Sequence, residues 1–283
     1  MVMRPGTKVK RAHGAPLGPP RLVPRAPRSS PPRPRAGRTA PHPFGGKICR
    51  MRFHGQAVVV SGAGTGIGAA VAAALAAEGA SVVLCGRRPA PLEETRASCE
   101  RAGARAVAAA LDVRDEVALA RAFDRAEALG PLEAAIACHG INLVAGAEEM
   151  PLRDWNEVVS TNLTGSFLFA REAARRMRAR ALGRIVLVSS VSGRPGHRKY
   201  PGFAAYAASK YGLTGLLEIL AVELDGSGVS ITMICPGGVE TEMFQRTFPG
   251  PRAFLTAGAA ADAILNLADP RTAPPSGTIV DLT

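Results

Sequence analysis

The chain has 283 residues, of which 47% are hydrophobic, and its formal net charge is +12. A charge of this size indicates binding to nucleic acid or to a membrane surface only if it is spread over the folded part. Residues 1–50 hold 12 of the 35 basic residues and no acidic residue, so the remaining chain, with 23 basic and 23 acidic residues, is formally neutral. Nucleic-acid binding by the folded part is therefore not expected, and the length suits one α/β domain.

Residues 1–50 also contain 11 of the 23 prolines and show no hydrophobic period. Such a segment buries too little apolar surface to offset its conformational entropy, so we expect a disordered basic tail. It has neither the apolar stretch of a secretory signal nor the helical pattern of a transit peptide. The alternative is that the native protein begins at Met51, where Arg52-Phe53-His54-Gly55 would make an ordinary start to a domain spanning 51–283.

The five cysteines have no CxxC spacing and the five histidines are scattered, so neither a disulfide framework nor a zinc site is expected. No stretch has the roughly 18 uninterrupted apolar residues that a membrane-spanning helix needs. These features favour a cytoplasmic protein that does not insert into a membrane.

From Gln56 onward, β-rich apolar runs alternate with Ala-rich segments of helical length, which predicts βαβ units and a parallel sheet. The runs are continuous, as expected of strands that helices cover on both faces. The expected fold class is α/β, a single-domain doubly wound Rossmann fold with a seven-stranded parallel sheet. The predicted strands are 57–61, 81–85, 105–111, 132–137, 184–189, 229–235 and 278–282. The predicted helices are 66–78, 91–102, 116–129, 153–180 in two pieces and 205–224, with an irregular lid over 241–257 before a last helix.

The first predicted strand runs into Ser61-Gly62-Ala63-Gly64-Thr65-Gly66-Ile67-Gly68 and then into a helix. Glycines in that context let the backbone turn tightly and approach a pyrophosphate, whose charge meets the free N–H groups at the helix start. A turn used only for packing is the alternative. The predicted contacts of this loop with a dinucleotide are Gly62, Thr65, Gly66, Ile67 and Gly68.

Tyr206 and Lys210 lie four residues apart on a predicted helix, so both side chains project from one face. The ordinary tyrosine pKa of about 10 is too high for efficient proton exchange near neutrality, and a nearby ammonium group is expected to lower it. Ser190 follows the fifth strand, where its hydroxyl can donate a hydrogen bond to a substrate carbonyl. Its neighbour Ser189 should point to the other face of the strand.

Together these motifs resemble the short-chain dehydrogenase/reductase family, from about Phe53 to the C-terminus. Gly62, Gly66 and Gly68 match the family pattern Gly-xxx-Gly-x-Gly. The resemblance implies a catalytic triad, a lysine that also holds the nicotinamide ribose, and an asparagine that holds a water for a proton relay. The catalytic residues it implies are Ser190, Tyr206, Lys210 and Asn162.

The resemblance further implies cofactor contacts beyond the glycine loop. Asp112 would accept a hydrogen bond from the adenine amino group, although an acidic residue after a strand is often only a helix cap. Thr241 would bond the nicotinamide carboxamide or a phosphate. The implied contacts outside the loop are Asp112, Val113, Gly140, Tyr206, Lys210, Pro236, Gly237, Val239 and Thr241.

The choice of cofactor depends on the end of the second strand. A carboxylate there would bond the ribose hydroxyls of NAD and repel the 2′-phosphate of NADP. This chain has Gly86 followed by Arg87 and Arg88, and two guanidinium groups can grip a phosphate. We therefore expect NADP(H) to be preferred and NAD(H) to be possible, with a solvated arginine loop as the alternative.

Two segments depart from the family pattern. Ala137-Cys138-His139-Gly140 replaces the usual Asn-Asn-Ala-Gly, so His139 is expected either to be a satisfied structural histidine or to tune proton balance beside the cofactor. The interval from Ser190 to Tyr206 is about three residues longer than usual, and its loop should lie over the substrate. Three polar residues of that loop either bind an anionic group or are solvated: His197, Arg198 and Lys199.

The predicted lid carries four large apolar side chains, Met243, Phe244, Phe248 and Phe254. Because binding pockets are mostly apolar, they favour a substrate with apolar bulk, although such residues also serve ordinary packing.

We therefore expect an NAD(P)-dependent oxidoreductase that reduces a ketone or aldehyde, or oxidises the matching secondary alcohol, by hydride transfer with Tyr206 as the acid or base. The alternative is a non-catalytic nucleotide-sensing regulator on the same fold, which would have no use for Tyr206 and Lys210. The resemblance also implies a homotetramer or dimer packed through helices 164–180 and 205–224. Association with nucleic acid would involve only the basic tail.

Overall fold

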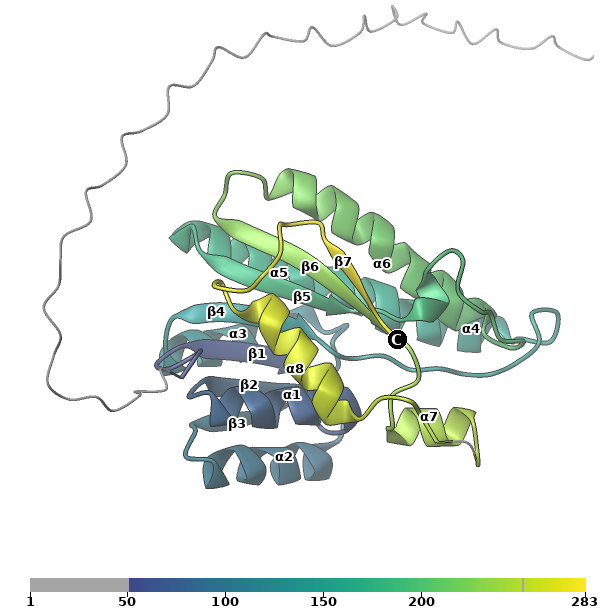
Figure 1. Ribbon diagram of the computed structural model, residues 1–283, viewed down its shortest axis with the longest axis horizontal. Helices are drawn as coiled ribbons and strands as arrows, with labels where there is room; N and C mark the ends of the chain where they lie inside the picture. Colours follow the sequence, from purple (N-terminus) through teal and green to yellow (C-terminus); the bar gives the residue numbers. More distant parts are fainter. Residues whose placement is uncertain (1–50, 251) are drawn as a thin grey trace, which may run out of the picture. The chain divides into compact units, whose positions relative to one another are not determined.

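The computed structural model describes residues 51–250 and 252–283. The expectations for residues 1–50 fall outside this part of the chain. One parallel sheet forms the centre of the described part, with the strand order β3-β2-β1-β4-β5-β6-β7 (Figure 1). Its strands are β1 (Ala57–Ser61), β2 (Ser81–Gly86), β3 (Ala106–Ala110), β4 (Leu132–Ala137), β5 (Gly183–Val188), β6 (Val229–Pro236) and β7 (Ile279–Leu282). The seven predicted strands are confirmed, each to within one residue at either end.

Helices cover both faces of the sheet, as the continuous apolar runs predicted. Every residue of β1 is buried, with Val59 in the core on one face and Val58 and Val60 in the core on the other. The first core is completed by α3 (Glu116–Leu129), α5 (Gly165–Arg180) and α6 (Ala204–Glu223). The second core is completed by α1 (Gly66–Ala77), α2 (Pro89–Arg101) and α8 (Ala257–Ala268). The doubly wound α/β class is therefore confirmed.

The predicted helical region 153–180 forms two pieces, as expected. α4 (Leu152–Val159) and α5 are joined by one π-helical turn, η1 (Ser160–Thr164). Such a turn carries an extra residue and is frequent at functional sites. Here it holds Asn162 in the interior of the protein, where that side chain is fully buried.

The prediction of an irregular lid over 241–257 is partly wrong, because Glu242–Thr247 forms a short helix, α7. Thr241 caps it, since its hydroxyl oxygen accepts a hydrogen bond from the Phe244 N–H at 3.2 Å. A threonine cap followed by an acidic residue in the first turn stabilises a helix start. The short helix is therefore stabilised by its own local sequence, the Thr241 cap and Glu242 in the first turn.

The order of the strands places a crevice at the carboxyl ends of β1 and β4. After β1 the chain crosses to β2 on one side, and after β4 it crosses to β5 on the other. Connections that leave neighbouring strands in opposite directions open a binding crevice between them in folds of this class. The glycine loop after β1 and Gly140 after β4 both lie at this edge of the sheet.

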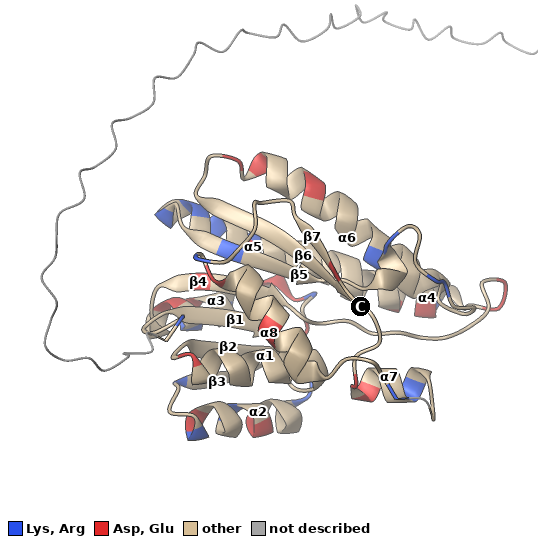
Figure 2. Ribbon diagram, in the orientation of Figure 1, with Lys and Arg blue, Asp and Glu red and all other residues tan. Residues whose placement is uncertain are grey.

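Charged side chains are mostly on helices and connections, and the strands carry few of them (Figure 2). This distribution agrees with a sheet buried on both faces. Within 51–250 and 252–283, no helix combines the length and the apolar character that crossing a bilayer requires.

Candidate active site

A cavity of about 750 Å³ runs along the carboxyl edge of the sheet. It extends from the glycine loop and the end of β2 to the side chains of Tyr206 and Lys210 on α6. Of the residues expected to bind a cofactor, those that line it are Gly62, Thr65, Gly66, Ile67, Gly68, Arg87, Arg88, Asp112, Val113, Gly140, Tyr206, Lys210 and Thr241. Pro236, Gly237 and Val239 do not line it, although they lead directly into Thr241. The glycine loop and the Tyr206–Lys210 pair thus line one cavity.

The glycine loop has the backbone that a dinucleotide requires. Gly62 has φ +67°, and a Cβ atom there would lie 2.7 Å from the backbone nitrogen of His139. Gly66 has φ +57°, a conformation that L side chains rarely adopt, and a Cβ atom there would lie 3.0 Å from Thr241 Cγ2. Thr65 begins α1 without a side-chain cap, so N–H groups of the first helical turn remain free to meet a phosphate. The loop therefore fits a dinucleotide pyrophosphate.

Tyr206 and Lys210 occupy the opposite end of the cavity, one helical turn apart on α6. Ser190 lies beside Tyr206, and its hydroxyl acts to lower the pKa of that residue. Lys210 is buried, donates to the Val188 carbonyl oxygen at 2.9 Å, and has its Nζ atom over the Tyr206 ring, 5.8 Å from the centroid. Ser189 has a different partner, because its hydroxyl donates to the Lys210 carbonyl oxygen. The two serines follow β5 and have different partners, but the cavity lining includes Ser189 and not Ser190.

The expected lowering of the Tyr206 pKa is not what the protein shows. Burial raises the pKa of Tyr206, with the Ser190 hydrogen bond acting in the opposite direction. The same burial lowers the pKa of the Lys210 ammonium to about 8. The four-residue spacing predicts that the phenolate and the ammonium attract each other, but it does not show that both groups are buried. The low dielectric around them disfavours each charged form.

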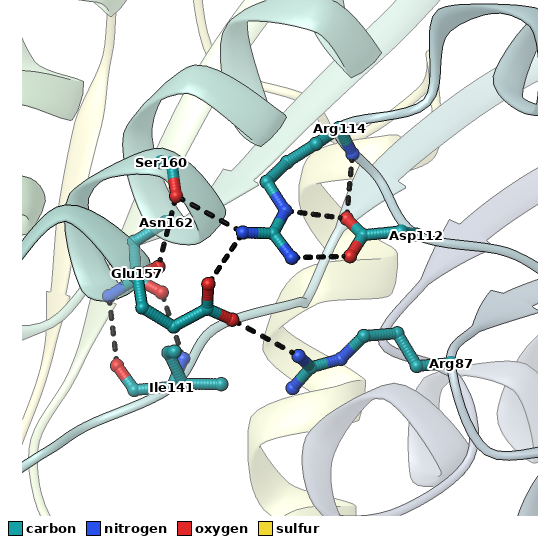
Figure 3. A network of polar contacts seen from close by, with 7 residues as sticks. All are labelled: Arg87, Asp112, Arg114, Ile141, Glu157, Ser160 and Asn162. Atoms are coloured by element: carbon teal, nitrogen blue, oxygen red, sulfur yellow. Dashed lines mark hydrogen bonds and ion pairs between the residues drawn. The ribbon is translucent and has the colours of Figure 1, made fainter. Parts of the chain in front are cut away.

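Asn162 lies between the end of β4 and α6. Its side-chain amide donates to the Ile141 carbonyl oxygen at 3.0 Å, and its oxygen accepts from the Ile141 N–H at 2.8 Å (Figure 3). The amide also donates to Ser209 Oγ at 3.0 Å. Gly140 is adjacent, because a Cβ atom there would lie 3.4 Å from Asn162 Oδ1 and 3.5 Å from Lys210 Nζ. Asn162 therefore holds the segment after β4 against the lysine.

His139 is a satisfied structural histidine, which was one of the two alternatives. The Ser166 hydroxyl donates to the Asn162 carbonyl oxygen at 2.7 Å, so its oxygen is left to accept from His139 Nε2–H at 3.2 Å. His139 Nδ1 then accepts from the Ser61 hydroxyl at 2.7 Å. Burial lowers the pKa of His139 to about 3, so the ring is neutral near pH 7 and does not exchange protons there.

The end of the cavity beside β2 is lined by paired charges. Arg87 and Arg88 are about half exposed, and each contacts one carboxylate: Glu157 at 3.4 Å and Glu242 at 2.9 Å respectively. Asp112 is engaged by Arg114, whose guanidinium donates to both of its oxygens. The helix cap beside it is Asp115, which accepts from the first N–H groups of α3. The suggestion that Asp112 is a helix cap is therefore wrong.

The longer loop before Tyr206 is held by its own polar residues. Lys199 donates to the carbonyl oxygens of Val191, Ser192 and Arg194. His197 lies 3.3 Å from Asp281 on β7. Arg198 and Lys199 are exposed, in agreement with the solvated alternative, although Lys199 and His197 also contact the chain around them. Binding of an anionic group by these side chains stays a prediction.

Aromatic rings connect this loop to the lid and to Tyr206. The Phe203 ring centroid lies 5.8 Å from those of both Tyr206 and Phe248, and Tyr200 lies 5.1 Å from Phe248. Phe244 extends the cluster, at 5.3 Å from Phe248. Phe254 is 97% exposed and lies outside the cluster, so the packing alternative does not describe it, and its contact with a substrate stays a prediction.

Comparison with known proteins agrees with this geometry. The family model described as short chain dehydrogenase matches residues 56–251, more than half of the chain. The chain belongs to the short-chain dehydrogenase family. It is therefore an NAD(P)-dependent oxidoreductase, and the family resemblance seen in the sequence is confirmed.

This dehydrogenase is 37% identical over 207 residues to galactitol 2-dehydrogenase (L-tagatose-forming) of Cereibacter sphaeroides, covering 73% of this chain and 80% of that protein. It is 36% identical to the 3beta-hydroxysteroid dehydrogenase of Mediterraneibacter gnavus, covering 72% and 73%. A crystal structure of a short chain dehydrogenase from Mycobacterium paratuberculosis bound to NAD matches with a TM-score of 0.73 and 26% identity, covering 82% and 97%. Glycine betaine reductase ATRR of Emericella nidulans is 34% identical over 190 residues, but the chain spans only 15% of that protein.

Sequence reasoning missed three charged residues of this dehydrogenase at the β2 end of the cavity. Arg114 follows Asp112 by two residues, and this spacing was the one available signal. Glu157 and Glu242 gave no signal, because they lie on helices far along the chain from the arginines that they contact.

Proposed function

We propose that this dehydrogenase uses NADP(H) in preference to NAD(H) to reduce a ketone or aldehyde with apolar bulk, or to oxidise the matching secondary alcohol. One observation carries the proposal: the Tyr206 and Lys210 side chains line the same cavity as the glycine loop, with Ser190 beside the tyrosine. This arrangement supports Tyr206 as the proton donor beside a bound dinucleotide.

We assign the chemical steps to four side chains. The nicotinamide, when bound, supplies or accepts the hydride. Tyr206 donates its phenolic proton to the carbonyl oxygen during reduction and recovers it during oxidation. Ser190 donates a hydrogen bond to the same oxygen and so stabilises the charge that develops there. The Lys210 ammonium stabilises the phenolate, and Asn162 holds the relay through which the proton is replaced.

The cofactor would be held along the whole edge of the sheet. The residues that fit its pyrophosphate are Gly62, Thr65, Gly66, Ile67 and Gly68. Asp112 and Val113 would contact the adenine, and the residues toward the nicotinamide are Gly140, Tyr206, Lys210, Pro236, Gly237, Val239 and Thr241. The preference for NADP(H) is supported by Arg87 and Arg88, which line the cavity where no carboxylate ends β2.

The proposed apolar bulk of the substrate is supported by the aromatic cluster. Tyr200, Phe203 and Phe248 continue from Tyr206 toward the lid, so a carbonyl group at Tyr206 would have its remaining carbon skeleton beside aromatic rings. The names of the relatives range from a sugar-alcohol dehydrogenase to a steroid dehydrogenase. Family membership alone therefore leaves the substrate class open, and the support for an apolar substrate comes from the side chains around Tyr206.

We also propose a homo-oligomer, packed through α5 and α6. Apolar side chains on the outer faces of these helices are exposed, among them Phe167 at 40%, Ile219 at 52% and Val222 at 72%. Association through these helices would remove them from water.

The test is the rate of NADPH and NADH oxidation with a panel of ketones and aldehydes, for the wild type, Tyr206→Phe and Tyr211→Phe. Tyr211 is on the same helix but 39% exposed and outside the cavity, so it controls for the loss of a hydroxyl. We expect Tyr206→Phe to reduce turnover by about 100-fold or more, with NADPH affinity nearly unchanged. Full turnover in Tyr206→Phe would refute its role. Nucleotide binding without turnover in the wild type would favour a nucleotide sensor.

A further inference from the structure

The two arginines at the β2 end of the cavity each contact a glutamate on a helix that lies far along the chain. We propose that Glu157 and Glu242 set the selectivity between NADP(H) and NAD(H), by competing with a 2′-phosphate for Arg87 and Arg88. The inference rests on the proposed binding of the cofactor beside β2, and it adds two residues that oppose the NADP preference attributed to the arginines.

Glu157 is held rigidly beside Arg87. One of its carboxylate oxygens accepts from Arg114 at 2.6 Å, and the other faces Arg87 at 3.4 Å (Figure 3). Arg114 is fixed in turn by Asp112, and its guanidinium also donates to Ser160 Oγ at 3.3 Å. Glu157 therefore cannot swing away from Arg87 without breaking its shorter contact with Arg114.

Glu242 pairs with Arg88 at the same end of the cavity. It is the first residue of α7, and its carboxylate accepts from Arg88 at 2.9 Å. This contact lowers the pKa of Glu242, so the carboxylate is charged at neutral pH. Arg246, on the same short helix, also lines the cavity. With Arg114, the region thus has four arginines and three carboxylates, counting Asp112, so most of its positive charge is neutralised.

The pairing of these charges limits the binding free energy that a 2′-phosphate can gain from the arginines. The phosphate must displace Glu157 or Glu242 from its arginine, or bind beside a charge of its own sign, whereas a ribose hydroxyl meets neither penalty. Both ion pairs are about half exposed, so solvent and salt weaken the effect. For each carboxylate we expect about a threefold to tenfold effect on NADPH affinity, the size of one screened charge near a protein surface.

The experiment measures dissociation constants of NADPH and NADH by titration calorimetry, which requires no knowledge of the substrate. The variants are Glu157→Gln, Glu242→Gln and the double variant, and each substitution keeps the side-chain shape and removes one charge. Glu100→Gln is the matched control, because Glu100 pairs with Arg96 on the surface of α2 and does not line the cavity. Each measurement is repeated at low and high salt.

We expect each cavity variant to bind NADPH about threefold to tenfold more tightly, to bind NADH within about twofold of wild type, and to lose most of the difference at high salt. The effects should multiply in the double variant, because the two pairs are separate. An unchanged NADPH-to-NADH ratio would overturn the inference. Weaker NADH binding in Glu157→Gln would also overturn it, by showing that this carboxylate binds the ribose instead.

These outcomes are separate from those of the proposed function. The wild-type ratio of NADPH to NADH affinity tests the proposed NADP preference. The change in that ratio between wild type and variants tests the role of the two carboxylates, whichever cofactor the wild type prefers.

Discussion

Burial of a neutral His139 predicts that the folded protein loses stability as the pH falls. His139 is 7% exposed and bonded to Ser61 and Ser166, and burial lowers its pKa from 6.5 to about 3. Because its pKa is lower in the folded state than in the unfolded state, the unfolded chain binds a proton first on acidification. The contribution of His139 to stability is therefore complete above about pH 6.5 and is lost as the pH falls toward 3.

The magnitude follows from the difference between the two pKa values. A pH of 5 lies about 1.5 units below the pKa of the histidine in the unfolded chain, so protonation stabilises the unfolded state by about 2 kcal/mol. At pH 4 the corresponding loss is about 3 kcal/mol. These are large fractions of the 5–15 kcal/mol that is typical of a folded domain, roughly speaking.

The assay is urea unfolding at a series of pH values from 7.5 to 4, followed by the fluorescence of Trp155, the single tryptophan of the chain. His139→Gln keeps a neutral polar side chain but does not titrate in this range. We expect the variant to be less stable at pH 7.5 by about 1–3 kcal/mol, because at least one buried hydrogen bond is lost. The difference from wild type should shrink as the pH falls. Parallel stability curves would refute the assignment of a neutral, buried His139.

Two further predictions concern Lys210 and the aromatic cluster that contains Phe248. Because burial lowers the pKa of Lys210 to about 8, its ammonium is lost above that pH, and kcat/KM for carbonyl reduction should fall there; a level profile through pH 9 would contradict this. Phe248→Ala opens the aromatic cluster beside Tyr200 and Phe203, so kcat/KM for a bulky apolar ketone should fall about tenfold or more relative to that for a small ketone. Equal losses for both ketones would show that Phe248 serves packing alone.

The strands and the two ends of the cavity could be predicted from the sequence because each depends on local pattern. Continuous apolar runs such as Ala57–Ser61 suit only strands covered on both faces. A glycine that needs φ +57°, such as Gly66, marks its turn by residue type alone. The four-residue spacing of Tyr206 and Lys210 places both on one helix face wherever that helix packs.

The charge states and the partners of these residues were decided by tertiary structure. Burial of Tyr206 depends on what packs over α6, so its raised pKa could not be inferred from a nearby lysine. The cap of α7 by Thr241 was a local signal that was overlooked, but the pairing of Arg87 with Glu157 was not local at all. It required α4 to pack beside the end of β2, 70 residues earlier in the chain. Backbone patterns are set by neighbours in sequence, whereas electrostatic energies depend on distance and dielectric in space, and only the folded chain determines both.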